Sequence, residues 1–368
     1  MPANLKPLTA LRFAAALWVV AYHYWPDLGL AEAQTPRLIA KGYLGVELFF
    51  VLSGFILCHV YLTPFGEGRF RYGPFLWARL ARIYPLHLAT LVGIGLMGGA
   101  ALAAGFTISH PVLDWPSLPA NLLLVQAWGL APQAAWNHPS WSISAEWSAY
   151  LSFPAFAWVA WRLRARPNLA VALALVLLFA LYAAYERATG QLLTRATIAW
   201  GPLRILPCFA YGCAVWLLWR SGVVRSRREA KLGAAAAAAA LLASVLAGAP
   251  DAAIVAACGG LILALAGLTS TGSRLLSGPA GVYLGEISFA VYMVAIPWQL
   301  LFINLARKGL HVGSAGLPGP LWLVYFAGVI PVAALAHHLV ERPARAAMRR
   351  LDWPRLRPTR DETPRNLT

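Results

Sequence analysis

Three titratable side chains in otherwise apolar stretches have the types needed for acid–base chemistry: His23, Glu47 and Glu146. Ionisable groups are costly in hydrocarbon, so each one inside a membrane span needs a partner or a chemical role. A carboxylate beside an imidazole fixes the ring's tautomer and stabilises its protonated form, as in a general base. We therefore take His23 as the candidate base, oriented by Glu146 or, in second place, by Glu47. A polar contact between helices is the simpler alternative.

A second set of charges in apolar surroundings consists of arginines. Arg79 and Arg82 are three residues apart, so on a helix both guanidinium groups lie on one face and can bind phosphate. Basic residues at the inner end of a span explain most such pairs, but Arg12 lies inside the first apolar run. Arg12 and His23 are eleven residues apart, which is about 16 Å along a helix. They can hold the two ends of an elongated ligand such as an acyl-CoA.

Three further residues are candidates for contacts with a substrate. Arg204 lies inside an apolar run. It either counters a buried carboxylate or contacts a second substrate, the acceptor of the acyl group. Trp141 and Trp147 flank Glu146 and can line an acceptor pocket, although tryptophans near span ends are typical of the aromatic belt at membrane interfaces. The four cysteines lie in apolar segments without metal-ligand spacing, so no metal site is predicted.

The elements that carry these residues are expected to be transmembrane helices. Hydrophobic residues make up 60% of the chain and charged residues only 12%, whereas a soluble domain carries roughly a quarter charged residues. A span needs about 20 apolar residues, and ten stretches qualify: 8–25, 42–61, 83–105, 141–161, 169–187, 198–219, 232–248, 252–268, 281–304 and 319–341. The stretch 118–132 is short and interrupted by prolines, which favours a re-entrant segment. The predicted fold class is all-α, a polytopic membrane helix bundle of about ten transmembrane helices.

The basic residues orient this bundle. The net charge of +16 is compatible with nucleic-acid binding, but the basic residues lie at the ends of apolar runs, which favours a lipid bilayer and no nucleic acid. With the N-terminus in the cytoplasm, 23 of the 30 lysines and arginines lie inside and six outside. This bias predicts that both termini are cytoplasmic. We expect a retained first span and not a signal peptide, a transmembrane domain over 1–346 and a polar cytoplasmic tail over 347–368.

The order and spacing of several motifs resemble the acyltransferase-3 family of membrane O-acyltransferases, from about Leu8 to Pro343. Arg12 and His23 match the family's Arg-x10-His pattern, and Arg79-Leu-Ala-Arg82 matches its Arg-x-x-Arg motif. Further matching segments are Gly45-Val-Glu-Leu-Phe-Phe-Val-Leu-Ser-Gly-Phe55, Trp141-Ser-Ile-Ser-Ala-Glu-Trp147, Leu284-Gly-Glu-Ile-Ser-Phe289 and Val340-Glu-Arg-Pro343. Many members carry Tyr-Leu-Trp-His-Trp-Pro in the penultimate span, where this chain reads Tyr292-Met-Val-Ala-Ile-Pro297.

This resemblance implies roles for the candidate residues. The family's catalytic histidine corresponds to His23, and its CoA-associated arginines correspond to Arg79 and Arg82. The expected activity is transfer of an acyl group, acetyl by default, from cytoplasmic acyl-CoA to a hydroxyl of an envelope or exported polysaccharide or related glycan. The expected location is the bacterial inner membrane. The missing histidine at 292–297 implies a different acceptor or acyl group and leaves His23 as the stronger base candidate.

Several alternatives stay open at this point. Succinyl or longer groups can replace acetyl, and direct transfer is not distinguished from an acyl-enzyme. The oligomeric state is open, a homo-oligomer included. A transporter or flippase for a glycan or lipid-linked substrate also places buried charges along a path through the bundle, but it gives no reason for a cytoplasmic phosphate-binding arginine pair. A scaffold subunit of an export machine is a third, weaker alternative.

Overall fold

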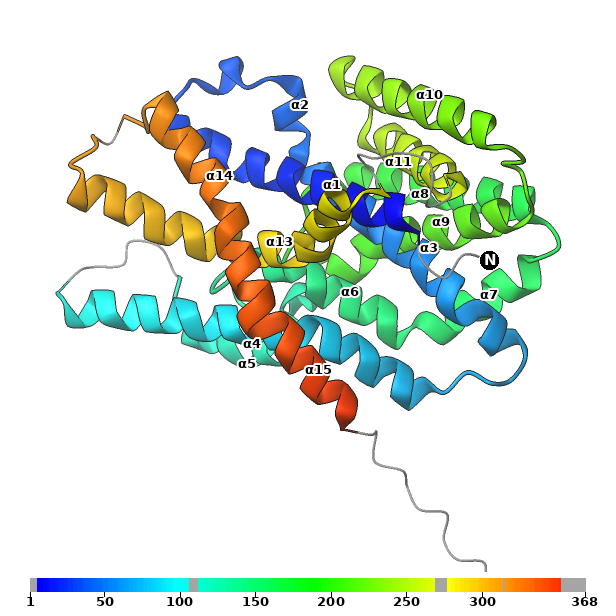
Figure 1. Cartoon of the computed structure of the whole chain (residues 1–368), viewed down its shortest axis with the longest axis horizontal. Helices are drawn as coiled ribbons and strands as arrows, with labels where there is room; N and C mark the ends of the chain where they lie inside the picture. Colours follow the sequence, from blue (N-terminus) through cyan, green and yellow to red (C-terminus); the bar gives the residue numbers. More distant parts are fainter. Residues whose placement is uncertain (1–4, 106–111, 269–276, 314, 352–368) are drawn as a thin grey trace, which may run out of the picture.

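The computed structural model describes residues 5–105, 112–268, 277–313 and 315–351. These residues form helices and turns without a strand among them (Figure 1), which confirms the all-α fold class. The α-helices are α1 (Lys6–Tyr24), α2 (Arg37–Ala40), α3 (Gly45–Gly66), α4 (Tyr72–Ala103), α5 (Leu118–Leu122), α6 (Trp141–Leu151), α7 (Phe153–Leu163), α8 (Pro167–Thr189), α9 (Gly201–Arg220), α10 (Arg227–Leu246), α11 (Asp251–Gly267), α13 (Pro279–Gly309), α14 (Gly319–Ala336) and α15 (Arg342–Arg350). Shorter 3-10 or π turns are η1 (Trp25–Leu28), η2 (Glu32–Gln34), η3 (Gly42–Leu44), η4 (Trp115–Ser117), η5 (Gln126–Leu130), η6 (His138–Ser140), η7 (Leu193–Arg195) and η8 (His337–Glu341).

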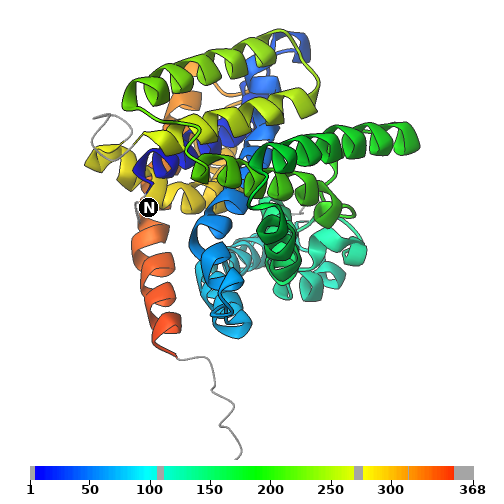
Figure 2. The same cartoon turned by 90° about the vertical axis from the view of Figure 1, so that its right-hand side faces the viewer.

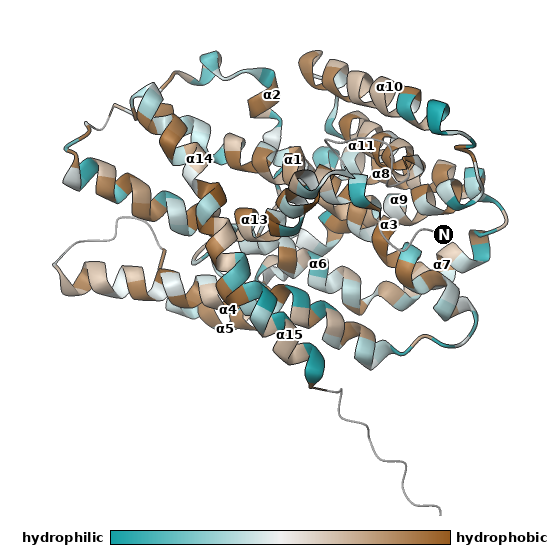
Figure 3. Ribbon diagram, viewed as in Figure 1, coloured by the Kyte–Doolittle hydropathy of each residue, from teal (hydrophilic) through white to brown (hydrophobic). Residues whose placement is uncertain are grey.

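Seven helical stretches among the described residues are long and apolar enough to cross a membrane, which confirms a polytopic bundle (Figure 3). They are Gly42–Gly66, Tyr72–Ala103, Pro167–Thr189, Gly201–Arg220, Arg227–Leu246, Pro279–Gly309 and Gly319–Arg350. The helix α11 is apolar but has only 17 residues. The helix α1 has 19 residues but is more polar, because Lys6, Arg12 and His23 lie on it.

The expected single span over 141–161 is wrong, because the helix breaks at Ser152 into α6 and α7, each eleven residues long. The backbone of Ser152 leaves the helical conformation (φ −90°, ψ 4°), and Pro154 follows in the first turn of α7. Proline lacks an N–H and is tolerated in the first turn of a helix but disrupts its interior. Neither helix alone has the roughly 20 residues that a crossing needs.

The segment 118–132 does not form a crossing helix. It consists of α5 and the π turn η5, and Gly129 within η5 has a left-handed backbone (φ 79°). The side-chain amide of Gln126 donates to the carbonyl of Ser140 (3.0 Å), and the backbone N–H of Ala127 donates to the hydroxyl of Ser144 (3.1 Å). Its irregular backbone is therefore paired with protein groups, as irregular segments at membrane depth require.

The turn before α6 places the start of this helix in the middle of the bundle. The amide of Asn137 donates to the carbonyl of Met293 (2.9 Å), and the hydroxyl of Tyr292 donates to the carbonyl of Pro139 (2.9 Å). Both contacts lie near the midpoint of the 31-residue α13. Trp141, the first residue of α6, therefore lies deep in the protein and not at its outer surface.

Two helix pairs form the centre of the bundle, α3 with α9 and α1 with α13 (Figures 1 and 2). A Cβ atom at Gly54 would lie 2.2 Å from the carbonyl oxygen of Phe209, and one at Gly212 would lie 1.9 Å from that of Val51. Glycine is required at both positions, since small residues let helix backbones approach closely in membranes. In Figure 2, α10 and α11 lie side by side at the edge of the bundle.

The C-terminal helix α15 packs against α4. It runs to Arg350, and the indole N–H of Trp77 donates to the carbonyl of Met348 (2.8 Å). The helix α15 therefore continues past residue 346. Residues 352–368 of the expected tail lie outside the described residues.

Candidate functional site

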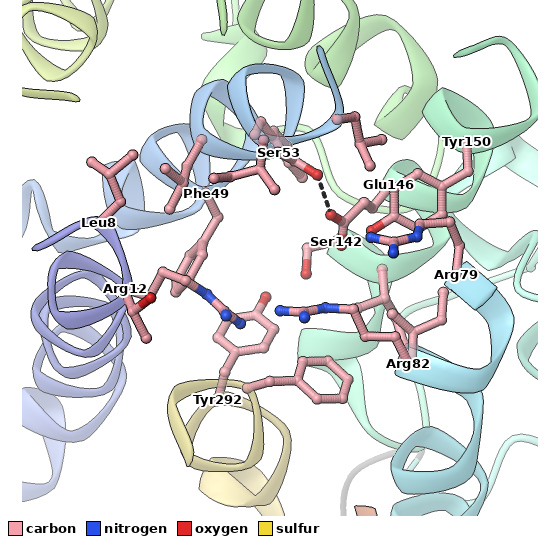
Figure 4. A pocket seen from close by; sticks show the side chains of 18 of the residues that line it. Leu8, Arg12, Phe49, Ser53, Arg79, Arg82, Ser142, Glu146, Tyr150 and Tyr292 are labelled. Atoms are coloured by element: carbon pink, nitrogen blue, oxygen red, sulfur yellow. Dashed lines mark hydrogen bonds between the residues drawn. The ribbon is translucent and has the colours of Figure 1, made fainter. Parts of the chain in front are cut away.

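A cavity of about 290 Å³ lies between α1, α3, α4, α6 and α13 (Figure 4). Arg12 and Arg82 extend toward one another across it, and Arg79 lies beside Glu146. The structure thus brings together the three arginines that the sequence assigned to the donor. The same cavity also contains Glu146, one of the two carboxylates that were expected to lie near His23.

Two of the arginines, Arg79 and Arg82, lie on the same helix, α4. This helix begins at Tyr72, so Arg79 and Arg82 lie within a regular helix and, three residues apart, on one face. Arg79 donates to the hydroxyl of Tyr61 (3.4 Å), while its Nε is buried without a hydrogen-bond partner among the described residues. Within the described part of the chain, Arg12, Arg79 and Arg82 form no ion pair. Three positive charges therefore face a cavity whose wall holds one carboxylate, Glu146, and the resulting excess of positive charge favours an anionic ligand.

Glu146 belongs to this cavity. One of its carboxylate oxygens accepts a hydrogen bond from the hydroxyl of Ser53 (2.5 Å; dashed line in Figure 4). The sequence placed Glu146 at the outer level with His23, because α6 was expected to enter from the outer surface. Since α6 begins at mid-depth, its sixth residue instead reaches the level of the arginines.

Glu47 lies in a different environment. Its carboxylate accepts a hydrogen bond from the Nε of Arg204 (2.5 Å), and both side chains are almost fully buried, 0% and 2% exposed. Arg204 also donates to the carbonyl of Ala196 (2.8 Å). The structure therefore shows that Arg204 counters a buried carboxylate, which is one of the two roles considered for it. Glu47 is the partner of Arg204, and it makes no hydrogen bond or ion pair with His23 in the described part of the chain.

The two tryptophans proposed for an acceptor pocket do not line the cavity of about 290 Å³. Trp141 is buried, and the guanidinium carbon of Arg204 lies 4.3 Å from the centroid of its ring, a cation–π contact. Trp147 is half-buried on α6. Trp141 therefore supports the ion pair of Arg204 in the core and does not lie at a membrane interface.

His23 is half-buried near the end of α1, and its ring contacts that of Tyr22 edge-on, with 5.1 Å between centroids. The titratable neighbour of His23 is His138 of η6. Burial, and secondarily the charge of Arg204, lower the pKa of His138 below its ordinary value. His138 is thus neutral near pH 7 and adds no positive charge beside His23.

The cavity lies beside the first part of α1, where Arg12 is the wall residue nearest to His23 in sequence. On α3 its wall includes Val46, and the preceding Gly45 packs against Ala15 and Val19 of α1. His23 itself does not line the cavity. It follows Arg12 by eleven residues on the same helix, which is about 16 Å along the axis.

Sequence reasoning missed Ser53, Tyr292 and His138. Ser53 is a polar residue in the middle of an apolar span, a signal that was present but not used. Tyr292 lines the cavity and donates to the carbonyl of Pro139, next to His138. No local pattern reveals that contact, because its partners are 153 residues apart.

Comparison with known proteins gives a consistent result. Residues 6–338 match the acyltransferase-3 family model, described as an acyltransferase domain. The chain is similar to acyltransferase MdmB of Streptomyces mycarofaciens, with 31% identity over an alignment of 373 residues that covers 92% of this chain and 91% of that protein. It is also similar to peptidoglycan O-acetyltransferase OatA of Listeria monocytogenes serovar 1/2a, 27% identical over 162 residues (40% of this chain, 23% of that protein). Protein 2 in the picA locus of Rhizobium radiobacter is 39% identical over 116 residues (32% and 52%). No solved structure matches.

Proposed function

Since the chain belongs to the acyltransferase-3 family, and so is an acyl-transferring membrane enzyme, we propose that it moves an acyl group from cytoplasmic acyl-CoA to a hydroxyl of an envelope or exported polysaccharide or related glycan. The observation that carries the proposal is the cavity lined by Arg12, Arg79 and Arg82, in which Arg12 lies on the same helix as His23, about 16 Å along its axis. Membership of this family argues against the transporter and scaffold alternatives.

The donor side of the proposal rests on charge and shape. Arg12, Arg79 and Arg82 offer guanidinium groups in a partly buried site, where hydrogen bonds to phosphate oxygens are about twice as strong as bonds between neutral groups. An acyl-CoA has phosphates at one end and its thioester at the end of a long, flexible arm. With the phosphates at the arginines, the arm lies along the cavity and the thioester points toward His23.

The proposed chemical step takes place at His23, at the outer end of the path that the pantetheine arm follows. His23 takes the proton from the acceptor hydroxyl, whose oxygen attacks the thioester carbonyl carbon. The C–S bond then breaks, an ester forms, and the proton held by His23 passes to the departing thiolate. General-base catalysis of this kind contributes roughly 10²- to 10⁴-fold to a rate. Glu146 is proposed to act within the donor cavity, where it is paired with Ser53, and not as the carboxylate that orients His23.

The acyl group, the acceptor and the location are also parts of the proposal. The name of the Listeria relative, a peptidoglycan O-acetyltransferase, supports acetyl as the group and a glycan hydroxyl as the acceptor. The 23-to-6 distribution of basic residues supports an orientation with both termini in the cytoplasm, where acyl-CoA is made. We place the protein in the bacterial inner membrane on these grounds.

The donor assignment is tested with purified protein in nanodiscs and radiolabelled acetyl-CoA. We expect the wild type to bind acetyl-CoA, and the double variant Arg79→Ala/Arg82→Ala to lose that binding, because two of the three cavity arginines are removed. Arg71→Ala is the matched control, since Arg71 is exposed and precedes the same helix. If the wild type binds no acetyl-, succinyl- or longer acyl-CoA, the proposed donor is wrong.

The acceptor is tested in cells that produce the protein. Deletion of the gene should lower the ester content of an exported polysaccharide, measured by NMR of the purified polymer before and after mild alkali. Wild-type protein should restore the esters, and the His23→Ala variant should not. Unchanged esters on every exported glycan after deletion would exclude a polysaccharide acceptor.

A further inference from the structure

A second cavity, of about 470 Å³, adjoins the one described above. The two share Arg12 and Arg82 in their walls. The far wall of the second cavity is formed largely by α15, which contributes Arg342, Arg345 and Arg349. Five arginines thus surround one space, and that space adjoins the donor cavity at three shared wall residues, Thr9, Arg12 and Arg82.

The helical period explains why α15 turns these residues to one side. Arg342, Arg345 and Arg349 are spaced i, i+3 and i+7, so they share one face of the helix. Arg350 is the next residue, about 100° further round, and it does not line the cavity. The hydrogen bond from Trp77 to Met348 holds α15 against α4, as the close approach of the two helices in Figure 1 illustrates.

The positive charge of this cavity is not balanced by the described residues. Its wall contains two carboxylates, Glu286 and Glu341. Glu341 already pairs with His337 (2.8 Å). None of the five arginines forms an ion pair within the described ranges, and Arg345 lies close enough to Arg82 for their charges to repel. Such an arrangement favours a ligand with several negative charges.

We propose that α15 is the binding site for the phosphorylated nucleotide end of the donor. The inference rests on the function proposed above, because it takes acyl-CoA as the donor. In this arrangement Arg345 and Arg349 bind the 3′-phosphate of the nucleotide. Arg12 and Arg82 bind the diphosphate where the two cavities meet, and the pantetheine arm continues past Glu146 toward His23.

The test separates the nucleotide from the rest of the donor. In nanodiscs of zwitterionic phosphatidylcholine, the KM of the wild type is compared with that of Arg345→Ala/Arg349→Ala for acetyl-CoA, acetyl-dephospho-CoA and acetyl-pantetheine. We expect KM for acetyl-CoA to rise about tenfold for each arginine removed, with little change in kcat. The KM for acetyl-pantetheine should not change, since that donor has no nucleotide. Arg350→Ala is the matched control on the same helix and should behave as the wild type.

A measurement on the wild type alone complements the variant. Removing the 3′-phosphate from the donor should raise the wild-type KM about a hundredfold, as much as the loss of both arginines, and the double variant should show no further loss with acetyl-dephospho-CoA. This comparison needs no altered protein, so a folding defect in the variant does not affect it.

Three outcomes would overturn the inference in distinguishable ways. Wild-type KM values in the double variant, alongside lost binding in Arg79→Ala/Arg82→Ala, would reject the role of α15 and leave the proposed function intact. An effect that appears only when anionic phosphatidylglycerol is added would assign the arginines to lipid headgroups. A wild type that turns over no acyl-CoA would reject the proposed donor, and the inference with it.

Discussion

The buried ion pair of Glu47 and Arg204 gives the sharpest prediction, because it decides whether Glu47 serves stability or chemistry. In the variant Glu47→Leu, Arg204 remains charged at a position only 2% exposed, since a guanidinium does not lose its proton in proteins. Breaking a buried pair in this way costs about 3–5 kcal/mol. Arg204 keeps the carbonyl of Ala196 and the ring of Trp141, which favours the lower end of that range.

The reciprocal variant should be milder. In Arg204→Met, the carboxyl group of Glu47 can take up a proton and become neutral, so we expect a loss of about 2 kcal/mol for an unsatisfied buried polar group. In the double variant Glu47→Leu/Arg204→Met neither charge remains, and replacement of a buried pair by apolar residues is often neutral for stability. The double variant should therefore be more stable than Glu47→Leu alone.

The assay combines stability with turnover. Unfolding is followed by titration with sodium dodecyl sulfate in mixed micelles, and acetyl transfer is measured on the folded fraction isolated by size-exclusion chromatography. We expect folded double variant to retain activity, since neither residue lines the donor cavity. A Glu47→Leu protein with wild-type stability and no activity would refute this reasoning and return Glu47 to the catalytic residues.

Three further predictions concern packing and the two ends of the site. Gly54→Ala and Gly212→Ala should each reduce the yield of folded protein, because each added methyl group would overlap a backbone carbonyl of the partner helix; wild-type yields would contradict this packing. His23→Ala should abolish transfer while acetyl-CoA binding in nanodiscs stays within about twofold of wild type, since His23 does not line the donor cavity; wild-type turnover would exclude it as the base. Ser53→Ala removes the hydrogen bond to Glu146, so acetyl-CoA binding should weaken by roughly tenfold, as for loss of one bond to a charged group, and unchanged binding would show that Ser53 does not position the carboxylate.

The parts of the site that follow from local sequence were predictable. Arg79 and Arg82 share a face because helical spacing alone places them together, and the structure shows both in the cavity with Arg12. The length and apolar content of most spans were also sufficient to identify them. Each of these predictions depends only on residues within a few turns of one another, for which the period of the helix is enough.

The depth of Glu146 depends on contacts that a local pattern does not contain. Counting residues from the start of an apolar run assumes that the run begins at a membrane surface. Here the preceding segment folds into the interior, where Asn137 is hydrogen-bonded to Met293 across 156 residues of sequence. The pairing of Glu47 with Arg204, 157 residues apart, is equally non-local. The sequence indicated that the buried charged residues have partners, because several of them were expected at the same depth. It did not indicate which residues pair with one another.

The same non-local contacts bear on how the proposed donor and acceptor are held apart in one bundle. The turn η6 connects the cavity wall with the surroundings of His23, because Tyr292 in the wall donates a hydrogen bond to Pro139 and the adjacent His138 lies near enough to His23 for their charges to interact. Under the proposed function, the group that passes from the cavity toward His23 is the pantetheine arm with its acyl group, which is more slender than a nucleotide or a glycan. In that proposal the nucleotide stays on the cavity side of η6 and the acceptor on the side of His23.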